Sequence, residues 1–190
     1  MEIITYIVNG HLTHQDSMGT KESLGRGSIQ FMTAGTGIRH SEFNHGDEPL
    51  RFIQTWIVPR ARGLTPNYGS CSGNRDKNTL QHLVSDVNNE GVTTPVKISQ
   101  DTDAYAAELD LNEKVTLDLP TDRQAYLICL EGSMTVNGNT LNKHDACEIH
   151  GGGGTLQMQA TEVEETENGK VAHFLMFTMP FVEGSGRSDL

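Results

Sequence analysis

The chain has few of the features that would place it outside the ordinary globular proteins. It contains 3 cysteines and 6 prolines in 190 residues, and aromatic residues make up 6%. An odd number of widely spaced cysteines, without a Cys-x-x-Cys pair, argues against a disulfide framework and a cysteine metal motif. No run reaches the ~18 apolar residues of a transmembrane helix, and the N-terminus has no basic leader region. We therefore expect a cytoplasmic protein without a membrane segment.

Basic residues are also scarce. The 14 Lys and Arg face 25 Asp and Glu, which gives a net charge of −11. The imbalance lies in residues 96–190, which carry 16 acidic and 6 basic groups, whereas residues 1–95 carry 9 and 8. Nucleic-acid binders usually present a dense basic patch, because phosphate neutralisation drives their affinity. Direct nucleic-acid binding is therefore not expected.

Short alternating runs bounded by Gly, Asn and Asp predict an all-β chain. Val115–Leu119 and Ala172–Thr178 are typical of such strands. Asn137-Gly138 lies between two further runs and predicts a two-residue hairpin turn, because both turn positions require positive φ. One short helix is expected at Asn78–Val87, where Leu80, Leu83 and Val87 share a helical face.

The chain also contains an internal repeat. Val8–Thr13 echoes Leu130–Thr135 at an offset of 122, and Leu24–Ile29 echoes Leu141–Ala146 at an offset of 117. The two copies predict two similar β-barrels in tandem. We place them at residues 1–94 and 95–190.

The densest candidate for chemistry is the segment Phe31–Glu42, which ends in His40-Ser41-Glu42. On a strand, His40 and Glu42 point to the same face, so an imidazole nitrogen and a carboxylate oxygen could bind one metal ion. A hydrogen-bonded surface pair is the alternative, and the spacing alone favours it.

The segments Glu2–Gly10, His14–Gly19 and Gly27–Glu42, followed by Trp56–Tyr68, resemble the pirin family of bicupins. The resemblance covers essentially the whole chain. It implies an all-β fold of two tandem cupin barrels, each a double-stranded β-helix or jelly roll.

The resemblance also implies a mononuclear metal, usually iron, in the first barrel. The family ligands are a His-x-His pair and the His and Glu that match His40 and Glu42. In the family pattern the His-x-His pair precedes the position of Glu2, so we expect the first barrel to be truncated at its N-terminus. Iron or another divalent metal should then bind weakly or not at all. His11, His14 and His45 could replace the missing pair, but we expect them to be structural or solvated.

In the second barrel, the offset of 117 places Gln157 and Gln159 where His40 and Glu42 stand in the first. Because neutral amides are poor ligands, we expect that barrel to lack metal ligands.

Two functions remain open. The first is a regulatory bicupin that contacts a protein partner, its metal site partial or lost. The second is a metal-dependent quercetin 2,3-dioxygenase acting on a small aromatic substrate, with Glu42 as catalytic ligand and proton acceptor. The absent His-x-His pair favours the first. Self-association is also expected, because the strand Ile3–Val8 would lack a sheet neighbour.

Overall fold

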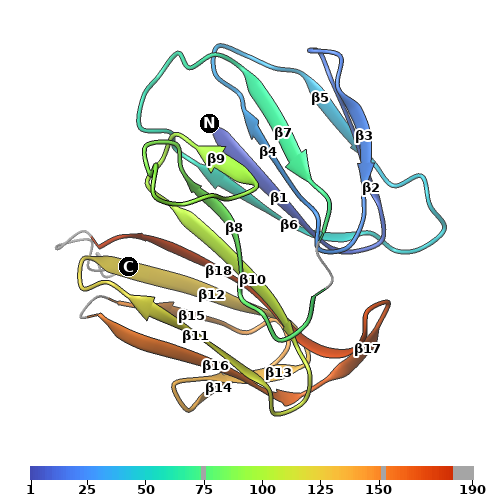
Figure 1. Ribbon diagram of the computed structural model, residues 1–190. Coiled ribbons are helices and arrows are strands. Elements are labelled where there is room, and N and C mark those ends of the chain that lie inside the picture. The colour runs from blue at the N-terminus through green and yellow to red at the C-terminus, as the bar shows by residue number, and fades with distance from the viewer. Residues whose placement is uncertain (74–75, 151–152, 182–190) are drawn as a thin grey trace, which may run out of the picture. The chain divides into compact units, whose positions relative to one another are not determined.

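In this computed structural model the described residues, 1–73, 76–150 and 153–181, form strands and no helix (Figure 1). No helix in the described part of the chain could therefore cross a membrane. The chain divides into two compact units. The first unit comprises residues 1–76 and 82–101, and the second comprises residues 77–81 and 102–190. The boundary expected at 94/95 thus lies inside the first unit.

The first unit contains two sheets. One has the order β6-β1-β4-β7 and the other β3-β2-β5. Strands β8 and β9 pair with each other in parallel. The bounds are β1 Glu2–Asn9, β2 Leu12–Asp16, β3 Lys21–Leu24, β4 Ile29–Thr33, β5 His40–Phe43, β6 Arg51–Ile57, β7 Asn67–Cys71, β8 Gln81–Asp86 and β9 Val96–Ile98.

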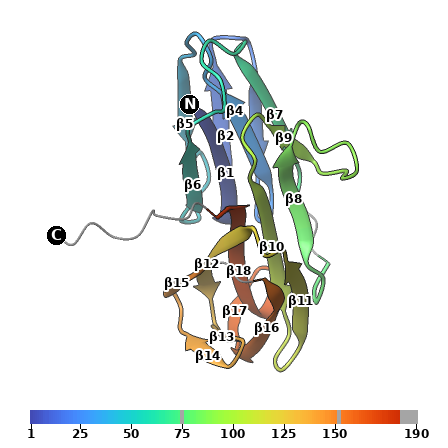
Figure 2. The same ribbon diagram turned by 90° about the vertical axis from the view of Figure 1, so that its left-hand side faces the viewer.

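The second unit also has two sheets, with strand orders β15-β12-β18-β10 and β11-β16-β13-β14, and β17 pairs with β18 (Figure 2). Its core is apolar and includes Leu127, Met158, Phe174 and Met176, each at most 1% exposed. The bounds are β10 Asp103–Leu109, β11 Lys114–Leu119, β12 Arg123–Glu131, β13 Ser133–Val136, β14 Asn139–Leu141, β15 Ala146–Ile149, β16 Gly154–Glu162, β17 Glu164–Thr166 and β18 Gly169–Pro180.

Both pairs of repeated sequence segments have the same backbone geometry in the two units. Gly10 and Gly132, 122 positions apart, form equivalent corners with φ of 75° and 68°. Gly27 and His144, 117 positions apart, have φ of 74° and 73°. The strand before each glycine corner also carries a bulge, in β1 and in β12. The two units therefore repeat one arrangement, in which β1 to β5 correspond to β12 to β16 and β6 corresponds to β18.

The predicted hairpin is confirmed, whereas the predicted helix is wrong. Asn137 and Gly138 have φ of 46° and 82°, and Val136 pairs with Asn139 across them. The segment Asn78–Val87 contains strand β8 instead of a helix. Leu83, Val84 and Ser85 are consecutive and all buried, as in a strand covered on both faces, so the helical spacing was incidental.

The expectation that Ile3–Val8 lacks a sheet neighbour is also wrong. Strand β1 pairs with β4 on one side and with β6 on the other, and its apolar side chains are buried. Within the described part of the first unit, the outer strands are β6 and β7 in one sheet and β3 and β5 in the other, so β5 and β6 have one sheet neighbour each. In the second unit, their counterparts β16 and β18 have an additional neighbour each, β11 and β10.

Candidate metal centre

The inner face of the first unit is polar where that of the second is apolar. Matching the strand registers of the two units shows which residues occupy equivalent positions. His14, Gln30, Glu42 and Gln54 of the first unit correspond, respectively, to Val136, Cys147, Met158 and Met176 of the second. Burying polar groups costs free energy unless they are hydrogen-bonded, so a core that only had to be stable would favour the apolar set. The contrast marks the interior of the first unit as a candidate functional site.

Strand β5 presents the two predicted ligands. His40 and Glu42 are two positions apart and face the same side of the strand. Their register partners on β2 are Asp16 and His14. His40 is exposed and Glu42 is half-buried. The structure therefore brings an imidazole and a carboxylate to one face, as the spacing predicted.

The Glu42 carboxylate is held by two glutamine side chains from the opposite sheet. Gln30 on β4 donates to Oε1 at 2.9 Å. Gln54 on β6 donates to Glu42 Oε2 at 3.1 Å. The Oε1 of Gln54 accepts a hydrogen bond from the Trp56 indole at 3.0 Å. Both glutamines donate through their amide nitrogens, which suits an ionised carboxylate. Such outer contacts orient a metal ligand and limit its motion.

The ring of His14 stacks against the rings of His40 and Tyr68. Its ring centroid lies 5.7 Å from that of His40 and 4.4 Å from that of Tyr68, with nearly parallel planes. His14 is 1% exposed, its Nε2 lies 3.2 Å from Asp16 Oδ2, and its Nδ1 has no hydrogen-bond partner. The expectation of a structural histidine fits this position, although the unpartnered nitrogen is unusual in a buried side chain.

Two pKa shifts accompany this packing. Burial raises the pKa of Tyr68, and its hydrogen bond to Glu22 and the nearby charges of Glu22, Asp16 and Glu42 raise it further. Burial also acts to raise the pKa of Asp16, but hydrogen bonds from Thr20, His14 and Met18 outweigh it, so this pKa lies below its usual value. Tyr68 is therefore a proton-retaining phenol, and Asp16 is a carboxylate beside His14.

The predicted counterparts in the second barrel were misplaced by one residue. Glu42 pairs with His14, and Met158 pairs with Val136 at the equivalent register position. Leu156 and Met158 therefore stand where His40 and Glu42 do, rather than Gln157 and Gln159. The connection before β16 shifts the local offset to 116, and a one-residue shift moves a side chain to the other face of a strand.

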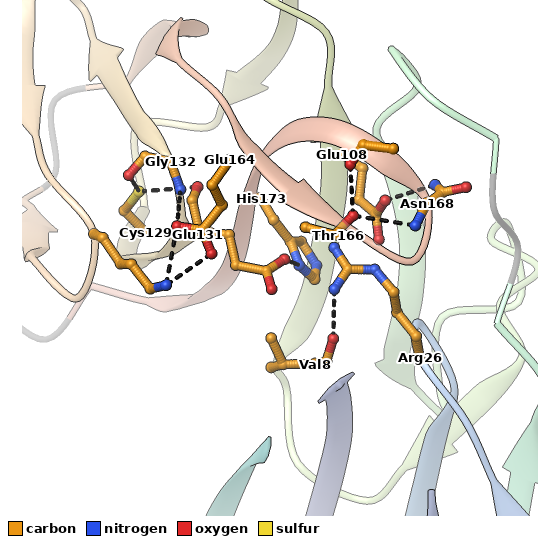
Figure 3. A network of polar contacts seen from close by, with 12 residues as sticks. Val8, Arg26, Glu108, Cys129, Glu131, Gly132, Glu164, Thr166, Asn168 and His173 are labelled. Carbon is orange, nitrogen blue, oxygen red and sulfur yellow. Dashed lines mark hydrogen bonds and ion pairs between the residues drawn. The ribbon is translucent and has the colours of Figure 1, made fainter. Parts of the chain in front are cut away.

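Two further histidines have other side-chain contacts. His45 stacks on Phe43 at 5.4 Å, and His173 in the second unit is fully buried, with Nδ1 3.0 Å from Glu131 (Figure 3). Among the described residues, no group of three or more His, Cys, Asp and Glu side chains is placed to hold a metal ion. His40 and Glu42 fit a divalent ion by ligand type and orientation, as a half-site of two ligands.

Sequence reasoning did not identify Gln30, Gln54 and Tyr68 as parts of this site. Their signal was present, because Gln30 and Gln54 interrupt apolar strands at Ile29–Met32 and Phe52–Ile57. An amide in such a run has to find a hydrogen-bond partner inside the fold.

Comparison with known proteins identifies both parts of the chain. Residues 1–57 match the family model of pirin, and residues 83–179 match that of the quercetinase C-terminal cupin domain. A pirin-like protein of Caulobacter vibrioides is 38% identical over 152 residues, which are 78% of this chain and 64% of that protein. Quercetin 2,3-dioxygenase of Escherichia coli is 35% identical over 150 residues, covering 78% and 63%. The chain thus spans less than two thirds of the length of these two relatives.

Solved structures support the same relationship. YhhW from Escherichia coli superposes with a TM-score of 0.79 at 31% identity, covering 95% of this chain and 72% of YhhW. YhhW in complex with nickel(II) gives a TM-score of 0.78 at 31% identity, covering 96% and 73%. With its two cupin units and its matched family models, the chain belongs to the pirin family.

Proposed function

We propose that the first unit binds a divalent metal ion through His40 and Glu42. With these two protein ligands alone, the chain acts as a regulatory or binding protein rather than as an oxygenase. The observation that carries the proposal is the polar interior of the first unit, where Glu42 accepts hydrogen bonds from Gln30 and Gln54 while the second unit has apolar residues at the corresponding positions. The complex of YhhW with nickel(II) supports a divalent ion.

Two protein ligands leave most of a metal ion's coordination sphere to water and give little advantage over the hydrated ion. Weak binding of iron or nickel is therefore expected. Elemental analysis of the purified 190-residue chain after dialysis against a chelator tests this. A stoichiometric, chelator-resistant metal would contradict the two-ligand site.

The second unit indicates where further ligands would enter. There, β11 pairs with β16, so that Val115 lies opposite Met158 and Leu117 opposite Leu156. A strand added in the same way to β5 would place two residues, two positions apart, opposite Glu42 and His40. A His-x-His sequence in that strand would supply two imidazoles to the same face.

The second candidate function is a quercetin 2,3-dioxygenase of the kind named among the relatives. A bound metal ion would supply Lewis-acid activation of an oxygenated aromatic substrate. The chain's own contribution would be Glu42, which binds the ion and accepts a proton, and His40, which binds beside it. The fixed Glu42 carboxylate favours this role.

One experiment separates the two functions. A chain extended upstream by a strand with a His-x-His sequence is loaded with iron or nickel and tested for quercetin oxygenation. Metal binding and turnover by the extended chain, both lost on Glu42→Gln, would support the oxygenase. Metal binding without turnover would support the binding function, and absence of metal binding would contradict the proposed site.

A further inference from the structure

Trp56 is an unusual residue for its position. It is the single tryptophan of the chain and is 61% exposed on β6, yet its indole N–H is hydrogen-bonded to Gln54. Phe52, Gln54 and Trp56 alternate along β6 and share one face, which the Gln54–Glu42 contact shows to be the face turned toward the candidate metal centre.

The hydrogen bonds that link Trp56, Gln54 and Glu42 fix the orientation of the Gln54 amide. An indole N–H can only donate, so the atom of Gln54 that it contacts must be the carbonyl oxygen. The amide nitrogen of Gln54 then faces the other way, where it donates to Glu42 and also contacts Thr5 Oγ1 at 3.3 Å. If the amide were reversed, its oxygen would face the Glu42 carboxylate, and the two acceptors would repel each other.

We propose that Trp56 is a positioning residue for Glu42 and acts through Gln54, whose amide it fixes in the orientation that donates to the carboxylate. The functional part of this inference rests on the proposed metal site at His40 and Glu42. Without the indole N–H, only Glu42 and Thr5 hold the Gln54 amide in this orientation, so its donor to Glu42 is placed less firmly than that of Gln30.

The first test needs no metal. In a ¹⁵N–¹H NMR spectrum of the metal-free 190-residue protein, the single tryptophan gives one indole cross-peak. We expect Gln54→Leu to move this peak to the position of a solvated indole, because the acceptor is lost. Glu42→Ala should also move the peak, because Glu42 accepts a hydrogen bond from the Gln54 amide that accepts from the indole. Trp56 is linked to Glu42 only through Gln54. Glu48→Ala changes an exposed acid near the end of β5 and is the control, so the peak should stay in place.

The second test measures nickel(II) affinity by calorimetry, with circular dichroism as the check of folding. Trp56→Phe keeps an aromatic ring but removes the N–H, and we expect its apparent Kd to rise about tenfold, the lower end of the range for loss of a group that is hydrogen-bonded to a metal ligand. Tyr126→Leu alters an exposed aromatic residue of the second unit and is the control, so it should leave the Kd unchanged.

The two tests separate the failure of the proposed function from the failure of this inference. If nickel(II) does not bind the wild-type chain, the proposed function is wrong, and the indole peak alone decides whether Trp56 is coupled to Glu42. An indole peak unmoved by Glu42→Ala overturns the inference. So does a folded Trp56→Phe variant that binds nickel(II) as tightly as the wild type.

Discussion

Asp16→Asn isolates the contribution of one buried charge to the stability of the first unit. Asp16 Oδ1 accepts backbone hydrogen bonds from Met18 at 2.8 Å and from Thr20 at 3.1 Å, and its Oδ2 faces His14 Nε2 at 3.2 Å. Asparagine has nearly the same shape and can keep its oxygen toward the two N–H groups. The substitution therefore replaces charge-assisted hydrogen bonds by neutral ones.

The magnitude follows from these contacts. A hydrogen bond to a charged group contributes about 1.5–3 kcal/mol and a neutral one about 0.5–1.5 kcal/mol, so each of the two backbone bonds should weaken by about 1 kcal/mol. We expect Asp16→Asn to lower the free energy of unfolding by about 2 kcal/mol at neutral pH. Asp47→Asn, at an exposed acid in the turn after β5, is the matched control and should stay within about 0.5 kcal/mol.

The difference should depend on pH. The folded pKa of Asp16 lies below its ordinary value, so its stabilising contribution is fully present above the pKa of the unfolded chain and is lost as the pH falls through the lower folded pKa. The gap between wild type and Asp16→Asn should therefore be constant from about pH 7 to about pH 5 and shrink below about pH 4.

Urea unfolding followed by the emission of Trp56 measures this, because the tryptophan lies in the first unit. A loss of less than about 0.5 kcal/mol at neutral pH would refute the hydrogen-bond argument. A loss of the expected size that persists unchanged into the acid range would show that packing, rather than charge, is responsible.

Three further predictions use other parts of the fold. Gly132→Ala should destabilise the second unit by more than about 2 kcal/mol in calorimetric unfolding, because φ is 68° and the new Cβ would lie 2.4 Å from the Glu162 carbonyl; Gly138→Ala, with φ of 82° and open space around it, should cost about 1 kcal/mol. Equal losses would contradict this. Thiol labelling of the folded protein should modify half-buried Cys71 first and Cys129 last, because burial raises the pKa of Cys147 and raises that of Cys129 to about 11. Early reaction of Cys129 would show that its strand opens. We also expect concentration-dependent self-association through β5 and β6, which are outer strands of the first unit's two sheets, and light scattering that shows a monomer at all concentrations would count against it.

The sequence by itself determined the all-β fold, the hairpin at Asn137-Gly138 and the internal repeat. These features are local, because alternation of side chains and positive φ at a turn depend on residues close in the chain. The glycines that repeat at 10 and 132 impose the same corner wherever they occur. The placement of His40 and Glu42 on one face of a strand also followed from the sequence, because alternate residues on one strand share a face without help from the rest of the fold.

Only the tertiary structure decided what surrounds those two ligands. Gln30 and Gln54 reach Glu42 from two strands of the opposite sheet, so their role depends on pairings that no local pattern specifies. The same holds for Asn78–Val87, where spacing allowed a helix but burial on both faces made Gln81–Asp86 a strand. Register in the second unit likewise moved the counterparts of His40 and Glu42 by one residue, to Leu156 and Met158. Strand register is set by contacts between distant segments, and a shift of one residue exchanges the buried and the exposed face.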